Sequence, residues 1–107
     1  MYNIFGFYKF KKLTNLKSKK KILDSLFKKN DIRGTIIISN EGLNGTISYK
    51  SNKFNCIIKS LKKIFNIKKF DNKNLSKYKF QAFHKGKIKI KREVVPLGIK
   101  IKKKISN

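Results

Sequence analysis

Residues 33–50 read "RGTIIISNEGLNGTISYK", two β-branched runs joined by a short polar stretch. Both runs have the Ile, Thr and Tyr content that favours strands. The stretch between them contains Asn44-Gly45, and this dipeptide favours tight hairpin turns because both residues tolerate a positive φ. The segment therefore predicts a β-hairpin, with strands at 33–39 and 46–50 and a connection at 40–45.

Helical patterns lie on both sides of this hairpin. Residues 18–30 begin with Ser18, whose hydroxyl can cap a helix N-terminus. Residues 52–65 form a second helical segment, and Cys56 lies about 160° or more from the centre of its apolar stripe, so we expect an exposed or half-exposed thiol. The two stripes comprise Ile22, Leu23, Leu26 and Phe27, and Phe54, Ile57, Ile58, Leu61 and Phe65.

Three further strands are predicted. Residues 2–10 are aromatic, and both of their alternating sets are apolar, which is typical of a central strand. Residues 78–83 and 87–95 alternate between apolar and polar side chains. Residues 66–77 contain Asn and Asp and are predicted to be a connection, with a turn at 84–86 between the last two strands.

The order of these elements is strand, helix, strand, strand, helix, strand, with one added strand at the end. This is the order of the ferredoxin-like split βαβ fold, in the α+β class. We expect an antiparallel sheet with both helices on one face, and a second face that is exposed or covered by something else. Residues 1–99 are predicted to form this one domain, and the basic residues 100–107 a linker or tail.

Positive charge is the strongest compositional feature. The 107 residues include 29 Lys plus Arg against 5 Asp plus Glu, a formal net charge of +24. A folded domain with this charge repels itself unless counterions or a polyanion neutralise it, and nucleic acid is the natural partner. The alternative is compositional drift, because Lys, Ile, Asn and Phe are residues that an AT-rich genome favours. Arg33 and Arg92 are the only arginines, so contact with RNA is expected mainly at phosphates.

The residue inventory restricts the chemistry. Cys56 is the only cysteine, which excludes an intramolecular disulfide and a cysteine-based zinc site. His84 is the only histidine, and we predict no catalytic residue and no metal site. No apolar run approaches the roughly 20 residues that span a bilayer, and the N-terminus is not a secretory signal. A cytoplasmic protein without a membrane partner is therefore expected.

A ladder of lysines lies near the end of the chain. Lys87, Lys89 and Lys91 share one face of the last predicted strand, roughly 6–7 Å apart, which approaches the phosphate repeat of a nucleic-acid strand. Lysines also protect edge strands against aggregation, and the two interpretations are compatible. The predicted RNA-binding residues are Arg33, Asn40, Asn44, His84, Lys85, Lys87, Lys89, Lys91 and Arg92.

The hairpin connection contains one acid, Glu41, beside Gly42 and close to Gly45. One interpretation is a structural turn, in which Asn40 and Glu41 bond free backbone N–H groups. The other is a recognition loop, in which Asn40, Glu41 and Asn44 face RNA or a partner domain. Because a carboxylate repels phosphate and no second catalytic group lies nearby in the sequence, we assign Glu41, Gly42 and Gly45 to a structural or recognition loop.

The aromatic residues are predicted to lie mainly in the core. One or two on the helix-free face could instead stack on bases or pack against a following domain. The residues considered are Phe5, Phe7, Tyr8, Phe80 and Phe83.

Three stretches resemble a known family: "FYKF" at 7–10, "IRGTIIISNEGLNGTIS" at 32–48 and "FQAFHKGKIKIKREVVPLGI" at 80–99. Together they resemble the N-terminal domain of the rhodanese-related tRNA uridine hydroxylases, over residues 2–99. The resemblance implies an acylphosphatase-like fold, which is a ferredoxin-like variant. It also implies an oxidoreductase that modifies tRNA by hydroxylating carbon 5 of the wobble uridine, with molecular oxygen as co-substrate.

In that family a rhodanese-like domain with an active-site thiolate follows this segment. The present sequence has no "C-x-x-G-x-R" loop. The resemblance therefore implies a tRNA-binding segment without a cofactor of its own, whose chemistry belongs to a rhodanese-like partner domain. Acylphosphatase activity is not implied, because residues 8–20 lack the Arg and Gly of a phosphate cradle.

Two other functions stay open. An RNA recognition motif shares the plan of sheet aromatics and positive charge, but it carries an aromatic consensus on its third strand. This chain has "NGTISYK" at 44–50 instead. The second alternative is a protein-docking module that binds a catalytic domain without touching RNA, in which case the charge is drift.

Overall fold

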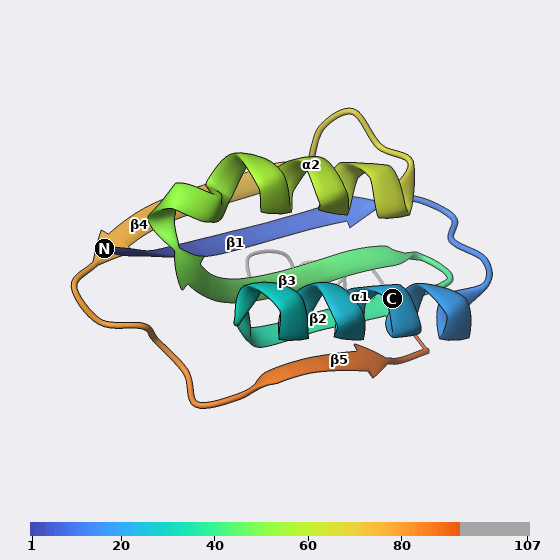
Figure 1. Ribbon diagram of the computed structural model, residues 1–107. Coiled ribbons are helices and arrows are strands. Elements are labelled where there is room, and N and C mark those ends of the chain that lie inside the picture. The colour runs from blue at the N-terminus through green and yellow to red at the C-terminus, as the bar shows by residue number, and fades with distance from the viewer. Residues whose placement is uncertain (93–107) are drawn as a thin grey trace, which may run out of the picture.

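The computed structural model describes residues 1–92 of the chain. Five strands and two helices follow one another in the order β1, α1, β2, β3, α2, β4, β5 (Figure 1). A short 3-10 turn at Ser51–Lys53 leads into α2. The elements are β1 Tyr2–Phe10, α1 Leu16–Asn30, β2 Arg33–Ser39, β3 Gly42–Lys50, α2 Phe54–Phe65, β4 Asn72–Tyr78 and β5 Gly86–Ile90.

The strands form one sheet in the order β4-β1-β3-β2-β5. The first four pair antiparallel, as the ferredoxin-like fold requires, so this predicted fold class is confirmed. The expectation of a wholly antiparallel sheet was wrong, because β5 pairs with β2 in parallel. Residues 79–85 run from the end of β4 to the opposite edge of the sheet, so β5 starts at the end where β2 also starts (Figure 1).

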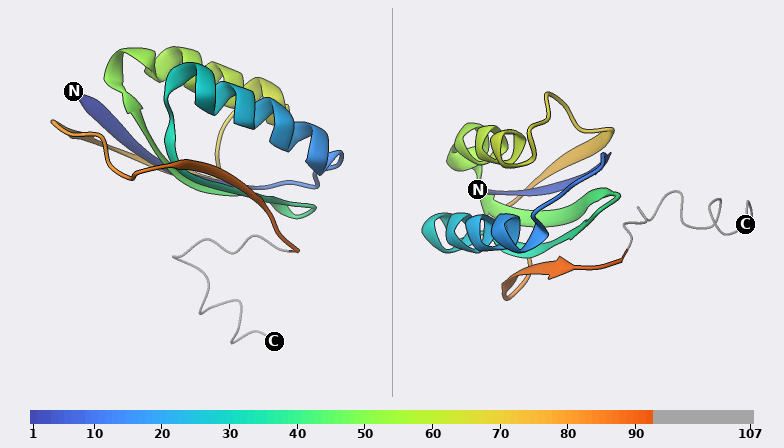
Figure 2. Two further views of the ribbon diagram at one scale, coloured as in Figure 1. Left: turned by 60° about the horizontal axis from the view of Figure 1, so that its bottom comes forward. Right: turned by 90° about the vertical axis from the view of Figure 1, so that its right-hand side faces the viewer.

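Both helices cover the same face of the sheet (Figure 2). Their apolar stripes pack on the alternate strand residues that point to this side, and together they form the core. Leu23, Ile57 and Leu61 from the helices and Ile36 and Ile47 from the strands are completely buried. Within residues 1–92, the sheet therefore has one face that makes the core and one face without helices.

Both helix starts differ from the prediction. α1 begins at Leu16, with Asn15 at the N-cap position in a left-handed conformation of φ 53°. The carbonyl of Asn15 accepts a hydrogen bond from Lys19 N at 3.0 Å, so the first turn forms before Ser18. Ser18 therefore lies inside the helix and is not its cap. α2 begins at Phe54, two residues after the predicted start.

The position of β4 was predicted wrongly. The strand covers residues 72–78, within and just beyond the expected connection, and the predicted strand at 78–83 is mostly irregular. All seven residues of β4 are exposed, so no apolar alternation marks the strand. Asp71 fixes its entry, because its backbone N–H donates to Tyr8 O at 2.9 Å and its carboxylate accepts from Phe10 N at 2.6 Å.

The last predicted strand is confirmed in part. β5 covers residues 86–90, and the backbone N–H of Lys91 donates to Ile38 O at 2.9 Å. The predicted turn at 84–86 is instead the end of the long 79–85 connection followed by Gly86, the first residue of β5. The rest of that prediction, the domain boundary at 99 and the tail at 100–107 lie outside the described residues.

Candidate nucleic-acid interface

Strand alternation and pairing divide the sheet residues between two sides. Residues such as Phe7, Ile36 and Ile47 point toward the helices and are buried. We call the other side the open face. From β4 across to β5, its side chains include Asn72, Asn74, Ser76, Tyr78, Tyr2, Ile4, Tyr8, Phe10, Asn44, Thr46, Lys50, Thr35, Ile37, Lys87 and Lys89.

The open face is basic along its β5 edge. Lys87 pairs in register with Thr35 and Lys89 with Ile37, and both lysines are exposed. In residues 1–92 the acids are Asp24, Asp31, Glu41 and Asp71, and none of these lies in a strand. The strands of this face therefore present lysines beside uncharged polar, apolar and aromatic side chains.

The structure gathers some of the predicted RNA-binding residues and separates others. Asn44, Lys87 and Lys89 lie on the open face, and Lys91 and Arg92 are exposed just after β5. The remaining four lie away from the middle of that face. They are Arg33 at the start of β2, Asn40 at the hairpin, and His84 and Lys85 in the 79–85 connection.

Arg33, His84 and Lys85 border a hollow that also contains two acids, Asp24 and Asp31. The guanidinium Nε of Arg33 lies 3.7 Å from a carboxylate oxygen of Asp31, and its Nη1 donates to Phe83 O at 3.4 Å. Arg33 is therefore partly neutralised at the end of the sheet. This corner has mixed charge, unlike the β5 edge of the open face.

The hairpin connection is shorter than predicted. β3 starts at Gly42, so Asn40 and Glu41 alone form the turn. Asn44-Gly45 lies inside β3, where Asn44 pairs with Ile37 and Gly45 with Ile36. The Asn-Gly signal was therefore misleading, because strand pairing and packing set the conformation of these two residues.

The two turn residues hold the connection that follows β1. The carbonyl of Glu41 accepts from Lys11 N at 2.9 Å, and the carbonyl of Asn40 accepts from Leu13 N at 3.1 Å. The Asn40 side chain donates to Leu13 O at 3.0 Å. The hydroxyl of Ser39 accepts from Glu41 N at 3.0 Å. These contacts support the structural interpretation of the loop.

Two glycines make this arrangement possible. Gly42 has φ +150°, and a Cβ at this position would lie 2.1 Å from Lys9 O. A Cβ at Gly45 would lie 2.8 Å from the ring of Phe7. Both glycines lie on β3, where Gly42 allows a close approach to the β1 backbone and Gly45 leaves room for the ring of Phe7 in the core.

The aromatic residues divide between the two faces. Phe5 and Phe7 are buried and stack with ring centroids 5.2 Å apart, as predicted for the core. Tyr8 and Phe10 meet edge to face on the open side at 5.6 Å, and Phe10 is 40% exposed. Phe83, predicted mainly as core, is 43% exposed.

The open face also contains residues that were not predicted as site residues. The alternation of β2 and β3 could be read from the sequence, and it places the side chains of Thr35 and Thr46 on this face. Asn72 and Asn74 could not be placed, because β4 was assigned to a different segment.

Three further features concern other kinds of site. Cys56 is exposed on α2, as predicted. Within residues 1–92, no group of three His, Cys, Asp or Glu side chains could hold a metal ion. In the same residues, neither helix is long and apolar enough to cross a membrane.

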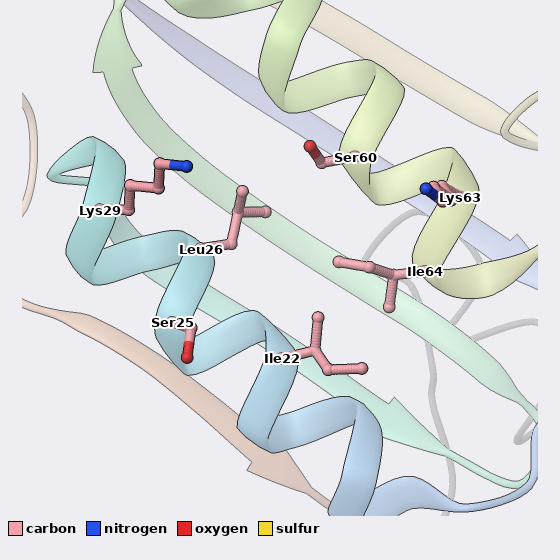
Figure 3. A pocket seen from close by; sticks show the side chains of 7 residues that line it. All are labelled: Ile22, Ser25, Leu26, Lys29, Ser60, Lys63 and Ile64. Atoms are coloured by element: carbon pink, nitrogen blue, oxygen red, sulfur yellow. The ribbon is translucent and has the colours of Figure 1, made fainter.

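A second surface lies between the helices, on the opposite side of the molecule. A groove of about 520 Å³ runs between α1 and α2, and Ile22, Leu26 and Ile64 point into it (Figure 3). Ile22 is 52% exposed. Lys29 and Lys63 stand at its rim (Figure 3).

The family model described as a UPF0176 acylphosphatase-like domain matches residues 2–94. This chain belongs to that family. The predicted resemblance to the acylphosphatase-like domain of the tRNA uridine hydroxylases is thereby confirmed.

Two curated relatives show what the family includes. A tRNA uridine(34) hydroxylase of Pelagibacter ubique (strain HTCC1062) is 58% identical over 104 residues, which are 97% of this chain and 35% of the relative. A tRNA uridine(34) hydroxylase of Wolbachia sp. subsp. Brugia malayi (strain TRS) is 37% identical over 93 residues, which are 87% of this chain and 34% of the relative. The chain thus spans about a third of the length of these relatives.

Solved structures agree with the fold. Full-length HypF in its phosphate- and nucleotide-bound form superposes with a TM-score of 0.59 at 11% identity, over 90% of this chain and 12% of HypF. A bacterial light-regulated adenylyl cyclase superposes with a TM-score of 0.54 at 19% identity, over 99% of this chain and 32% of the cyclase chain. At these identities the likeness concerns the fold alone.

Proposed function

We propose that this chain is the tRNA-binding N-terminal domain of a tRNA uridine hydroxylase. The proposal rests on the family and on one structural observation, the open face. This face has an edge of exposed lysines and, in the described strands, no carboxylate. The domain then holds the tRNA and presents the wobble uridine to a rhodanese-like domain, where oxygen-dependent hydroxylation at carbon 5 takes place.

The placement of the acids supports this assignment. Asp24 pairs with Lys20 at 3.0 Å, Asp71 with Lys9 at 3.3 Å, and Asp31 lies near Arg33. These contacts neutralise cations on the helices and at the ends of strands, and the lysines of β5 keep their charge for phosphate. Each phosphate neutralised by a lysine releases a counterion, which makes binding strong at low salt.

The proposal is tested by measuring tRNA affinity over a range of salt concentrations. The logarithm of the affinity should fall linearly with the logarithm of salt concentration, with a slope of about −0.7 to −0.9 per phosphate contact. Heparin at the same charge concentration serves as a competitor. Binding to tRNA no tighter than to heparin would contradict selective recognition.

A second measurement tests where the chemistry takes place. The purified 107-residue chain is incubated with tRNA and oxygen, and the nucleosides are then analysed by mass spectrometry. We expect no 5-hydroxyuridine. Its formation would contradict the assignment of the reaction to another domain.

The groove between α1 and α2 favours a second candidate function, docking of a partner domain. Its exposed Ile22 and apolar floor suit an apolar partner, and about two thirds of each relative's length lies outside the matched segment. We propose the catalytic domain of the same protein as the occupant. Ile22→Glu should then weaken association with the separately produced remainder of a full-length relative and leave tRNA affinity unchanged. Equal association of both forms would contradict docking at this groove.

A further inference from the structure

We propose that a hollow on the open face, beside Phe83, is a pocket for a single unpaired nucleobase of the bound RNA. This inference rests on the proposed function and specifies the part of the RNA that the face recognises. The hollow has a volume of about 190 Å³, and side chains of Thr35, Ile37, Asn44, Thr46 and Phe83 line it. Pockets for drug-sized ligands occupy about 300–1,000 Å³, so this one suits one planar ring.

The chemistry of the lining suits a base. The ring of Phe83 and the side chain of Ile37 offer apolar surface to the faces of a heterocycle. The hydroxyls of Thr35 and Thr46 can donate and accept at its polar edge, and Asn44 adds a neutral polar side chain to the lining. Neutral donors and acceptors of this kind match the edge of a base, whereas phosphate is matched by cations.

Phe83 is held in its position at an energetic cost. Its φ is +70°, a region that bulky residues rarely occupy. Arg33 Nη1 donates to Phe83 O at 3.4 Å, and Gly34 N donates to Lys85 O at 2.8 Å. Gln81 Nε2 donates to both Asp31 O at 2.8 Å and Ser48 O at 3.1 Å. Strained residues fixed by their surroundings in this way are concentrated at ligand sites.

Cations for the adjoining phosphates lie next to the hollow. Lys87 and Lys89 are the register neighbours of Thr35 and Ile37, one strand away at about 4.8 Å. A nucleotide with its base in the hollow can therefore place its phosphates along the β5 edge. In a duplex the polar edges of the bases are already paired, so the site selects a loop or another single-stranded segment.

The experiment compares two RNA probes of the same length. One is an eight-nucleotide oligouridylate, and the other has the same phosphates but abasic riboses. We expect the full chain to bind the oligouridylate about tenfold more tightly, because stacking and edge contacts act on bases alone. Phe83→Leu should remove most of this difference and leave affinity for the abasic probe unchanged.

Phe80→Leu is the matched control. Phe80 lies in the same connection, is 81% exposed and does not line the hollow. The Phe80→Leu variant should bind both probes as the unaltered chain does. Urea unfolding of each variant checks that the fold is retained. Equal affinity of the unaltered chain for both probes, or no effect of Phe83→Leu, would overturn the pocket and leave phosphate binding intact. Failure to bind either probe would contradict the proposed function itself.

Discussion

The two faces of the sheet are built from the same strands but differ in composition. In β3, Ile47 points to the helices and is completely buried, whereas its neighbour Thr46 is exposed on the open face. The covered face gains stability from apolar contacts, and the open face presents lysines, threonines, asparagines and aromatic rings. Alternate positions of one strand can therefore serve stability and recognition separately.

The largest expected effect separates these two roles within β3. Ile47→Ala removes buried methyl and methylene groups and leaves a cavity, so it should lower the free energy of unfolding by about 2–5 kcal/mol. Thr46→Ala, one residue away, should change it by less than about 0.5 kcal/mol. Urea unfolding of both variants provides the measurement. Similar losses for both would mean that the open face is part of a buried interface.

The next effect concerns two glycines on β1 and β3. Gly42→Ala forces a side chain into a positive-φ position and toward Lys9 O, and should cost about 1–3 kcal/mol. Gly6→Ala is the control, because its nearest contact is the movable side chain of Asn74 at 3.1 Å. The change in thermal unfolding midpoint should be several degrees larger for Gly42→Ala. A harmless Gly42→Ala would argue against the tight contact between the hairpin and β1.

A charge comparison addresses the open face directly. Replacing Lys87, Lys89 and Lys91 together by Gln should weaken tRNA binding about tenfold and reduce the salt slope by about 2–3. The control replaces Lys21, Lys28 and Lys29 on α1, which removes the same charge from exposed helix positions. Its effect should be smaller in both respects. Equal losses for the two triple variants would indicate that net charge alone determines binding.

Much of the fold was predictable because burial leaves a pattern. β1 and β2 were located correctly, since their apolar residues are set by the core. β4 was missed because an exposed edge strand has no such requirement, and its position depends on backbone pairing with β1. The orientation of β5 also depended on where β4 ends, so this error followed from the first.

The candidate site was predictable to a smaller degree. Alternation placed Lys87 and Lys89 on one side of their strand, but the sequence did not show which residues lie beside them. The hollow combines Phe83 with residues of β3, almost 40 positions away in the chain, and with residues of β2, almost 50 positions away. Only the path of the 79–85 connection brings them together.

The smallest expected effect concerns Asp71, a carboxylate that lies beside the sheet and supports its edge. The hydrogen bond from Phe10 N lowers the pKa of Asp71 below its ordinary value of 3.8, and Lys9 contributes further. The charged form is thus favoured in the folded state. Its contribution to stability is complete above the ordinary pKa and is lost as the pH falls through the lowered folded value.

Asp71→Asn should therefore lower the free energy of unfolding at pH 7 by about 0.5–1 kcal/mol, because solvent screens this partly exposed group. The difference between the two proteins should diminish as the pH falls from 3.8 through the lowered pKa of folded Asp71, below which both side chains are neutral. Urea unfolding at both pH values provides the test. A difference that is unchanged at low pH would show that the shape of the side chain, and not its charge, holds β4 against β1.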